Sequence, residues 1–160
     1  MPDLREPSQR VSPAARRLWL LESAGEGVFT LAVLLVVSHF WAPFDVRWWM
    51  VALLVAAVAA SVWVVPAWKY AVHRWEVTET AVYTQTGWWA RERRIAPMTR
   101  IQTVDYSEGA LERLFGLATV TVTTASAAGA LRIAGLDREL AQRLSAELTV
   151  RADADPGDAT

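Results

Sequence analysis

Two long stretches without a charged side chain dominate the first half of the chain. The first covers about 18 residues (27–44) and the second about 21 residues (48–68), which as helices reach about 27 Å and about 31 Å. Both lengths match the thickness of a hydrocarbon core. A helix in a soluble bundle needs a polar face, and residues 51–65 offer only Ser61. The pattern therefore favours a transmembrane hairpin, with spans at about 20–42 and 48–68, over two buried helices of a soluble protein.

Basic residues beside the spans predict how the hairpin is oriented. Arg10, Arg16 and Arg17 precede the first span, whereas Lys69 and Arg74 follow the second. Because positive residues stay on the cytoplasmic side, both termini are expected in the cytoplasm. Tryptophans favour the membrane interface, and four of them lie at the expected span ends: Trp41, Trp48, Trp49 and Trp68.

After Lys69 the hydrophobic pattern changes to short alternating segments typical of strands. Residues 71–106 predict several strands separated by turns, and two more strands are expected at 117–124 and 131–134. A short helix is expected at 107–115, with Ser107 as its cap and Gly116 as its stop. Leucines recur every four residues in a final helix after Asp137: Leu136, Leu140, Leu144 and Leu148.

These elements predict a two-helix transmembrane hairpin followed by an α+β domain, mainly β, that is a small barrel or sandwich capped by a C-terminal helix. The expected organisation is a cytoplasmic tail (1–13), the hairpin (14–68), the cytoplasmic β domain (69–151) and a disordered acidic tail (152–160).

Composition narrows the range of functions. Sixteen basic residues nearly balance seventeen acidic ones, which argues against a nucleic-acid binder. The chain has no cysteine, so it has no disulfide, no thiolate metal ligand and no cysteine nucleophile. No phosphate-binding loop, nucleophile motif or metal-ligand pair is apparent, and Asp105 with Glu108 flanks an expected helix start, where acidic side chains favour the helix dipole. We therefore expect a protein that is not an enzyme and has no metal site or cofactor.

Family-like motifs occur in the segments 74–78, 87–89, 95–104 and 111–120. Together they resemble the bacterial pleckstrin-homology-like domain of YdbS-type membrane proteins, and the resemblance covers roughly residues 15–150. It implies a pleckstrin-homology-like fold on the cytoplasmic face of a bacterial plasma membrane. It also implies that a larger protein with several such domains is often encoded nearby.

A basic and aromatic cluster marks one expected hairpin of the β domain, which we call the 88–94 hairpin. Its members are Trp88, Trp89, Arg91, Arg93 and Arg94. Because the domain is tethered close to the bilayer, the cluster is a candidate site for anionic phospholipid headgroups. The alternative is a solvated strand whose tryptophans pack into the core.

Polar residues within the family-like motifs form a second candidate site. Its members are Arg100, Ile101, Gln102, Arg113, Phe115 and Gly116. They either pin the short helix to the sheet through charge-assisted hydrogen bonds or form a surface that recognises a protein partner.

Two carboxylates, Glu22 and Glu26, lie one helical turn apart near the start of the first span. Carboxylates inside a membrane often serve a function, here a proton or cation site. The alternative is that they lie at headgroup level and pair with Arg16, Arg17 or Lys69.

Three functional hypotheses follow from the sequence. The first is an integral membrane protein whose cytoplasmic domain associates with itself or with a larger multi-domain relative, in envelope homeostasis or stress resistance. The second is binding of anionic lipid by the 88–94 hairpin. The third and weakest is a small transporter subunit that uses Glu22 and Glu26.

Overall fold

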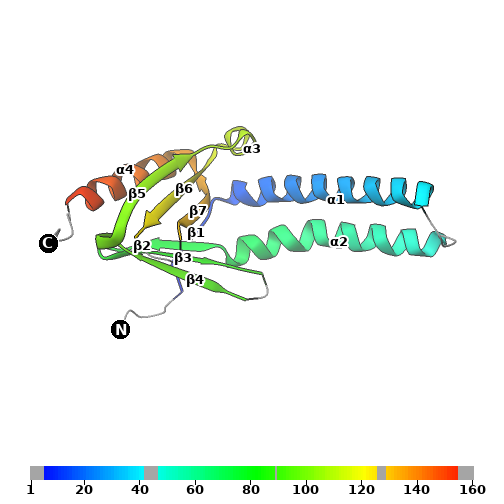
Figure 1. The fold of residues 1–160 in the computed structure, drawn as a ribbon, viewed down its shortest axis with the longest axis horizontal. Helices are drawn as coiled ribbons and strands as arrows, with labels where there is room; N and C mark the ends of the chain where they lie inside the picture. The colour runs from blue at the N-terminus through cyan, green and yellow to red at the C-terminus, as the bar shows by residue number, and fades with distance from the viewer. Residues whose placement is uncertain (1–5, 42–46, 89, 126–128, 155–160) are drawn as a thin grey trace.

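Two antiparallel helices project from one end of a β domain (Figure 1). The computed structural model describes residues 6–41, 47–88, 90–125 and 129–154. Helix α1 covers Pro13–Trp41 and helix α2 covers Trp48–Val72. Most of the connection between them, residues 42–46, lies outside the described residues.

Most of the length of both helices is uncovered by the rest of the chain. Only 6% of the most apolar window in each helix is buried. Phe29 and Phe40 on α1, and Trp48 and Trp63 on α2, all expose more than half of their surface. A soluble protein would bury such side chains. The exposure therefore argues against the soluble-bundle interpretation and agrees with two membrane-spanning helices.

Seven strands form two antiparallel sheets in the described part of the β domain, in agreement with the expected sandwich. The four-stranded sheet consists of β1 (Gln9–Arg10), β2 (Arg74–Val77), β3 (Ala81–Thr86) and β4 (Glu92–Pro97) in that order. A 3₁₀ turn at Met98–Arg100 leads to the three-stranded sheet, which consists of β5 (Ile101–Ser107), β6 (Leu117–Thr124) and β7 (Leu131–Asp137).

The C-terminal helix α4 (Arg138–Ala154) lies across the three-stranded sheet (Figure 1). Leu144 and Leu148 are buried and Leu140 is partly buried, as the leucine repeat predicts. Leu136 is also buried, but it belongs to the end of β7. The helix extends to Ala154, so the first residues of the segment expected to be disordered are helical, and 155–160 lie outside the described residues.

The segment that precedes the first span is part of the β domain. Gln9 and Arg10 pair with Trp75 and Arg74 of β2, which adds an edge strand that the sequence analysis did not anticipate. Ser12 then donates its backbone N–H to the carbonyl of Gly135 (2.9 Å) and its hydroxyl to Asp137 Oδ1 (2.7 Å).

The first two turns of α1 continue into the hydrophobic core. Their buried side chains are those of Ala14, Ala15, Leu18 and Trp19. α1 is therefore anchored in the β domain before it enters the membrane.

The short helix differs from its prediction. α3 covers only Ala110–Leu114, and Ser107 is the last residue of β5 rather than a helix cap. Residues 108 and 109 make the turn between the two elements, because β5 remains paired with β6 up to Ser107 opposite Thr119. Gly116 follows the helix with a positive φ of 66°, as expected for its stop.

Candidate functional site

The junction between the hairpin and the β domain centres on Trp19, which is only 5% exposed. The Lys69 Nζ atom of α2 lies 4.4 Å from the centre of the indole ring, a cation–π contact. The His73 ring lies 5.6 Å from the same ring. The C-terminal end of α2 therefore meets the start of α1 on one aromatic side chain.

His73 ends α2 and is largely enclosed at this junction. Burial disfavours the charged imidazolium, and the neighbouring Lys69 ammonium disfavours it further, so the pKa of His73 is lowered to about 4. The histidine is therefore neutral at physiological pH.

Glu22 and Glu26 both lie on α1 beyond Trp19 and both interact electrostatically with Lys69. This attraction acts over a distance, because in the described part of the chain neither carboxylate forms an ion pair with Lys69, Arg16 or Arg17. The two carboxylates differ in their surroundings, because Glu26 but not Glu22 lines a pocket between α1 and α2.

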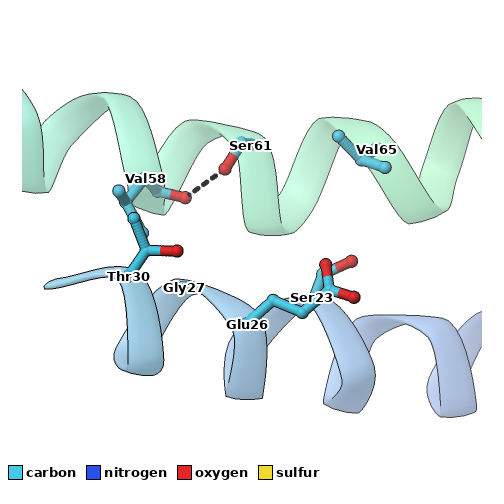
Figure 2. Close-up of a pocket in the computed structure, with 7 residues that line it drawn as sticks. All are labelled: Ser23, Glu26, Gly27, Thr30, Val58, Ser61 and Val65. Atoms are coloured by element: carbon cyan, nitrogen blue, oxygen red, sulfur yellow. Dashed lines mark hydrogen bonds between the residues drawn. The ribbon is translucent and has the colours of Figure 1, made fainter. Parts of the chain in front are cut away.

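That pocket is half open and has a volume of about 220 Å³. Figure 2 shows the side chains of Ser23, Glu26 and Thr30 reaching from α1 toward α2, where Ser61 faces them. The helices approach closely beside it, since a Cβ atom at Gly27 would lie 2.9 Å from Val58 Cγ1. The small side chains of Ser23, Thr30 and Ser61 beside this close contact do not fill the space between the helices.

The 88–94 hairpin contacts α2 at the end of the membrane-spanning region. Trp68 Nε1 donates a hydrogen bond to the carbonyl of Trp88 (3.1 Å), and the two indole rings meet edge to face at 6.2 Å. Trp88 is 43% exposed, so it is not packed in the core. Trp89, the other tryptophan of the predicted cluster, lies outside the described residues.

The arginines of this hairpin are engaged by acidic and amide groups of the chain itself. Arg91 and Arg93 share Glu6, with nitrogen–oxygen distances of 2.9 Å and 3.5 Å. Arg93 also donates to Gln85 Oε1 (2.9 Å). Arg94 pairs with Glu92 (2.6 Å) and donates to the carbonyl of Ala130 (3.3 Å). These contacts reduce the positive charge that the sequence pattern offers to a headgroup.

Helix α3 is held to the sheet by Glu112, which the sequence analysis did not single out. Its Oε1 accepts from the hydroxyl of Thr119 on β6 (2.7 Å) and its Oε2 from the backbone N–H of Gly109 (2.8 Å). The first bond also satisfies the hydroxyl of Thr119, which is fully buried. A glutamate three residues after a turn residue is the signal that could have indicated it.

A second set of contacts centres on Glu108, just before α3. Its carboxylate accepts a hydrogen bond from the Tyr106 hydroxyl and pairs with Arg138 (3.0 Å) and Arg113 (3.6 Å). The Tyr106 hydrogen bond and the two guanidinium groups lower the pKa of Glu108 despite its burial. The Arg113 side chain therefore links α3 to the turn just before it.

The predicted partner surface divides into two parts. Arg100, Ile101 and Gln102 lie at the start of β5, whereas Arg113, Phe115 and Gly116 follow its other end. Ile101 pairs with Thr124 and Ser107 with Thr119, so the length of the strand separates the two groups. In Figure 1, α3 lies toward the end of the domain from which the helices project, and the start of β5 lies at the opposite end.

Comparison with known proteins identifies this architecture. The family model described as "Bacterial PH domain" matches residues 26–152, which include most of the helical hairpin as well as the β domain. The chain belongs to the bacterial PH domain family. It is also 31% identical over 143 residues to the UPF0699 transmembrane protein YdbS of Bacillus subtilis (strain 168), an alignment that covers 87% of this chain and 89% of that protein. No solved structure matches.

The match confirms the resemblance that the motifs indicated. It also establishes that this is a membrane protein with a PH domain, because the relative that spans nearly the whole chain is a transmembrane protein. Neither match is to an enzyme family. Among the described residues, no group of three or more histidine, aspartate or glutamate side chains is placed to hold a metal ion.

Proposed function

We propose that this is a non-enzymatic membrane protein whose PH domain associates with another membrane protein, in particular a larger one with several PH domains. In the proposed orientation both termini and the PH domain lie in the cytoplasm and the helical hairpin spans the bacterial plasma membrane. The positive residues Arg10, Arg16, Arg17 and Lys69, all on the domain side of the helices, support this orientation. The proposed process is envelope homeostasis or stress resistance.

The exposed leucines of α3 are the observation that carries the proposal. Leu114 is 79% exposed and Leu111 is 40% exposed, on a helix of only five residues. Glu112 and Arg113 fix this helix through polar contacts with Thr119 and Glu108. An apolar pair that is rigidly held outside the core is typical of a protein interface, because its burial by a partner is favourable and costs little ordering entropy.

The position of α3 fits a partner in the same membrane. Along the long axis of the molecule, α3 lies at the end of the domain from which α1 and α2 project (Figure 1). A partner that reaches it must lie close to the bilayer surface. A second membrane protein satisfies this condition, and its own PH domain would lie at the same height.

The test is recovery of a partner with full-length, tagged protein extracted from native membranes in mild detergent. We expect a membrane protein that carries PH domains to co-purify, and Leu111→Ser with Leu114→Ser to lower its recovery at least tenfold. Val150→Ser is the matched control, since this apolar side chain is 67% exposed on α4. A wild-type protein that runs as a monomer with no partner, or a double variant that retains it fully, would overturn the proposal.

Binding of anionic lipid by the 88–94 hairpin is the second candidate, and the contact between Trp68 and Trp88 favours it. This contact keeps the hairpin tip at the end of the membrane-spanning region, where indole rings prefer the interface. Arg91 and Arg93 would have to exchange Glu6 for a phosphate group. Exposed ion pairs of this kind contribute about 0–1 kcal/mol, so the exchange is energetically accessible.

Hydrogen exchange of residues 86–94 in nanodiscs tests this second candidate. The full chain is required, because residues 9–19 are part of the domain. Anionic lipid should slow exchange relative to neutral lipid, and Arg91→Gln with Arg93→Gln should remove the difference. Equal exchange in both lipids would refute anionic recognition.

A further inference from the structure

The pocket between α1 and α2 lies within the hydrocarbon region of the membrane. α1 ends at Trp41, about 15 residues beyond Glu26, so the carboxylate lies about 22 Å from the outer end of the hairpin. In α2, Trp68 lies about 20 residues, or about 30 Å, from Trp48 and marks the other boundary. Glu26 is therefore about 8 Å inside the membrane on the domain side.

The Glu26 carboxylate has no direct partner within the described part of the chain. No hydrogen bond or ion pair joins it to another described residue, and its long-range attraction to Lys69 is shared with Glu22. The Lys69 ammonium is held over the Trp19 ring instead. A carboxylate at this depth is costly unless a donor reaches it.

The other polar groups of the pocket are hydroxyls, which can accept as well as donate hydrogen bonds. The Ser61 hydroxyl donates to the carbonyl of Val58 (2.7 Å), which leaves its oxygen lone pairs facing the gap. Ser23 and Thr30 add two further hydroxyls beside Glu26 (Figure 2). An acidic group surrounded by hydroxyl oxygens fits a multivalent cationic donor, either an ammonium or a guanidinium group.

We propose that this pocket receives a lysine or arginine side chain from a membrane-spanning helix of the partner protein. The pocket is open on one side, so a neighbouring helix can present such a side chain, and its volume of about 220 Å³ accommodates the end of one long side chain. Pairing in hydrocarbon removes the cost of an isolated charge on each helix. The inference rests on the proposed association and specifies the partner: one with a basic residue about one and a half turns inside the membrane boundary.

A photo-crosslinking amino acid at Val65, which lines the pocket, tests the proposal in native membranes. We expect an adduct with a partner helix that carries Lys or Arg within one turn of the crosslinked residue. Placement of the same group at Leu53, which is 66% exposed elsewhere on α2, should not give this adduct.

Charge variants test whether the Val65 adduct depends on an ion pair with Glu26 or only on the closeness of the two helices. Glu26→Gln should lower the Val65 adduct at least tenfold, and Glu22→Gln should leave it unchanged. Glu26→Lys should abolish the adduct, and exchange of the partner's basic residue for Glu should restore it. An adduct only with lipid or with a second copy of this chain, no adduct at all, or an adduct indifferent to Glu26→Gln would each overturn the proposal.

The result is independent of the α3 experiment. Loss of the Val65 adduct in Glu26→Gln, with co-purification still dependent on Leu111 and Leu114, supports both proposals. If co-purification depends on the leucines while Val65 gives no adduct, the association stands and the intramembrane pairing fails. Limited proteolysis of each variant confirms that the β domain is folded.

Discussion

The first turns of α1 and the part that follows them occupy different surroundings although they belong to one continuous helix. Near its start Trp19 is 5% exposed and contacts His73 and Lys69, whereas ten residues later Phe29 is 70% exposed. Both are large aromatic residues on the same helix. The first is covered by the protein and the second by lipid, so one end of the helix contributes to folding of the β domain and the other places it in the membrane.

The start of α1 is joined to the β domain by direct contacts with β7. Ser12 bonds to Gly135 and Asp137, and Trp19 packs beside Gly135. A change in the tilt of α1 relative to the domain would have to break these contacts with β7.

The sharpest comparison replaces one aromatic residue near the start of α1 and one near its middle. Trp19→Ala should lower the free energy of unfolding of the β domain by about 4 kcal/mol, because it leaves a large cavity in the core. Phe29→Ala should lower it by less than about 1 kcal/mol, since that side chain is not in the core. Denaturant titration of the full chain in micelles measures both values. Equal losses would show that the junction is not part of the core.

The close contact between β7 and α1 can be broken at Gly135. A Cβ atom there would lie 2.8 Å from Ala15 Cβ, and the residue has a φ of 77°. Gly135→Ala should lower the free energy of unfolding by about 3 kcal/mol, from overpacking together with the strained φ.

Gly129→Ala is the matched control for this substitution. Gly129 has a φ of 80° but an added Cβ would meet nothing within 4 Å, so only about 1 kcal/mol should be lost. In the double variant with Ala15→Gly, a coupling energy near zero would contradict the contact.

Acidification should weaken the same junction through His73. Its pKa is about 4 in the folded protein and about 6.5 when unfolded, so the unfolded chain binds more protons between these values. Stability is therefore complete above pH 6.5 and falls as the pH decreases toward 4. Between pH 6.5 and 5 the expected loss is about 1.5 kcal/mol. Unfolding titrations at both pH values measure it, and His73→Gln should show a smaller difference; an unchanged difference would assign it to another group.

The smallest effect is expected at α3, which lies outside this junction. Glu112→Ala removes the acceptor for Thr119 and Gly109 and should lower stability by about 1 kcal/mol. Hydrogen exchange should accelerate in residues 110–116 while the amides of α1 near Trp19 stay protected. Acceleration in both regions would mean that the two are not separate cooperative units.

Local patterns predicted most of the fold. The uncharged stretches predicted both helices, and the leucine repeat predicted the buried face of the C-terminal helix. These features depend on residues close together in the chain, whose side chains must share one face of one element.

The candidate site was less accessible to sequence analysis. The arginines of the 88–94 hairpin suggested a free positive surface, but Glu6, more than eighty residues away, pairs with Arg91 and Arg93. Likewise, the motif residue Ile101 begins β5, whereas Phe115 lies beyond the other end of this strand. The extended strand therefore separates two residues that are only 14 positions apart in the sequence.

By itself, the sequence determined the membrane hairpin, the mainly β domain and its closing helix, since each follows from hydrophobic periodicity within one segment. Only the tertiary structure decided that residues 9–19 belong to the β domain and that α3 exposes Leu114. It also placed Glu26 in a polar pocket between two helices. Burial and pairing of these groups depend on which distant segments meet, and a local pattern carries no information about that.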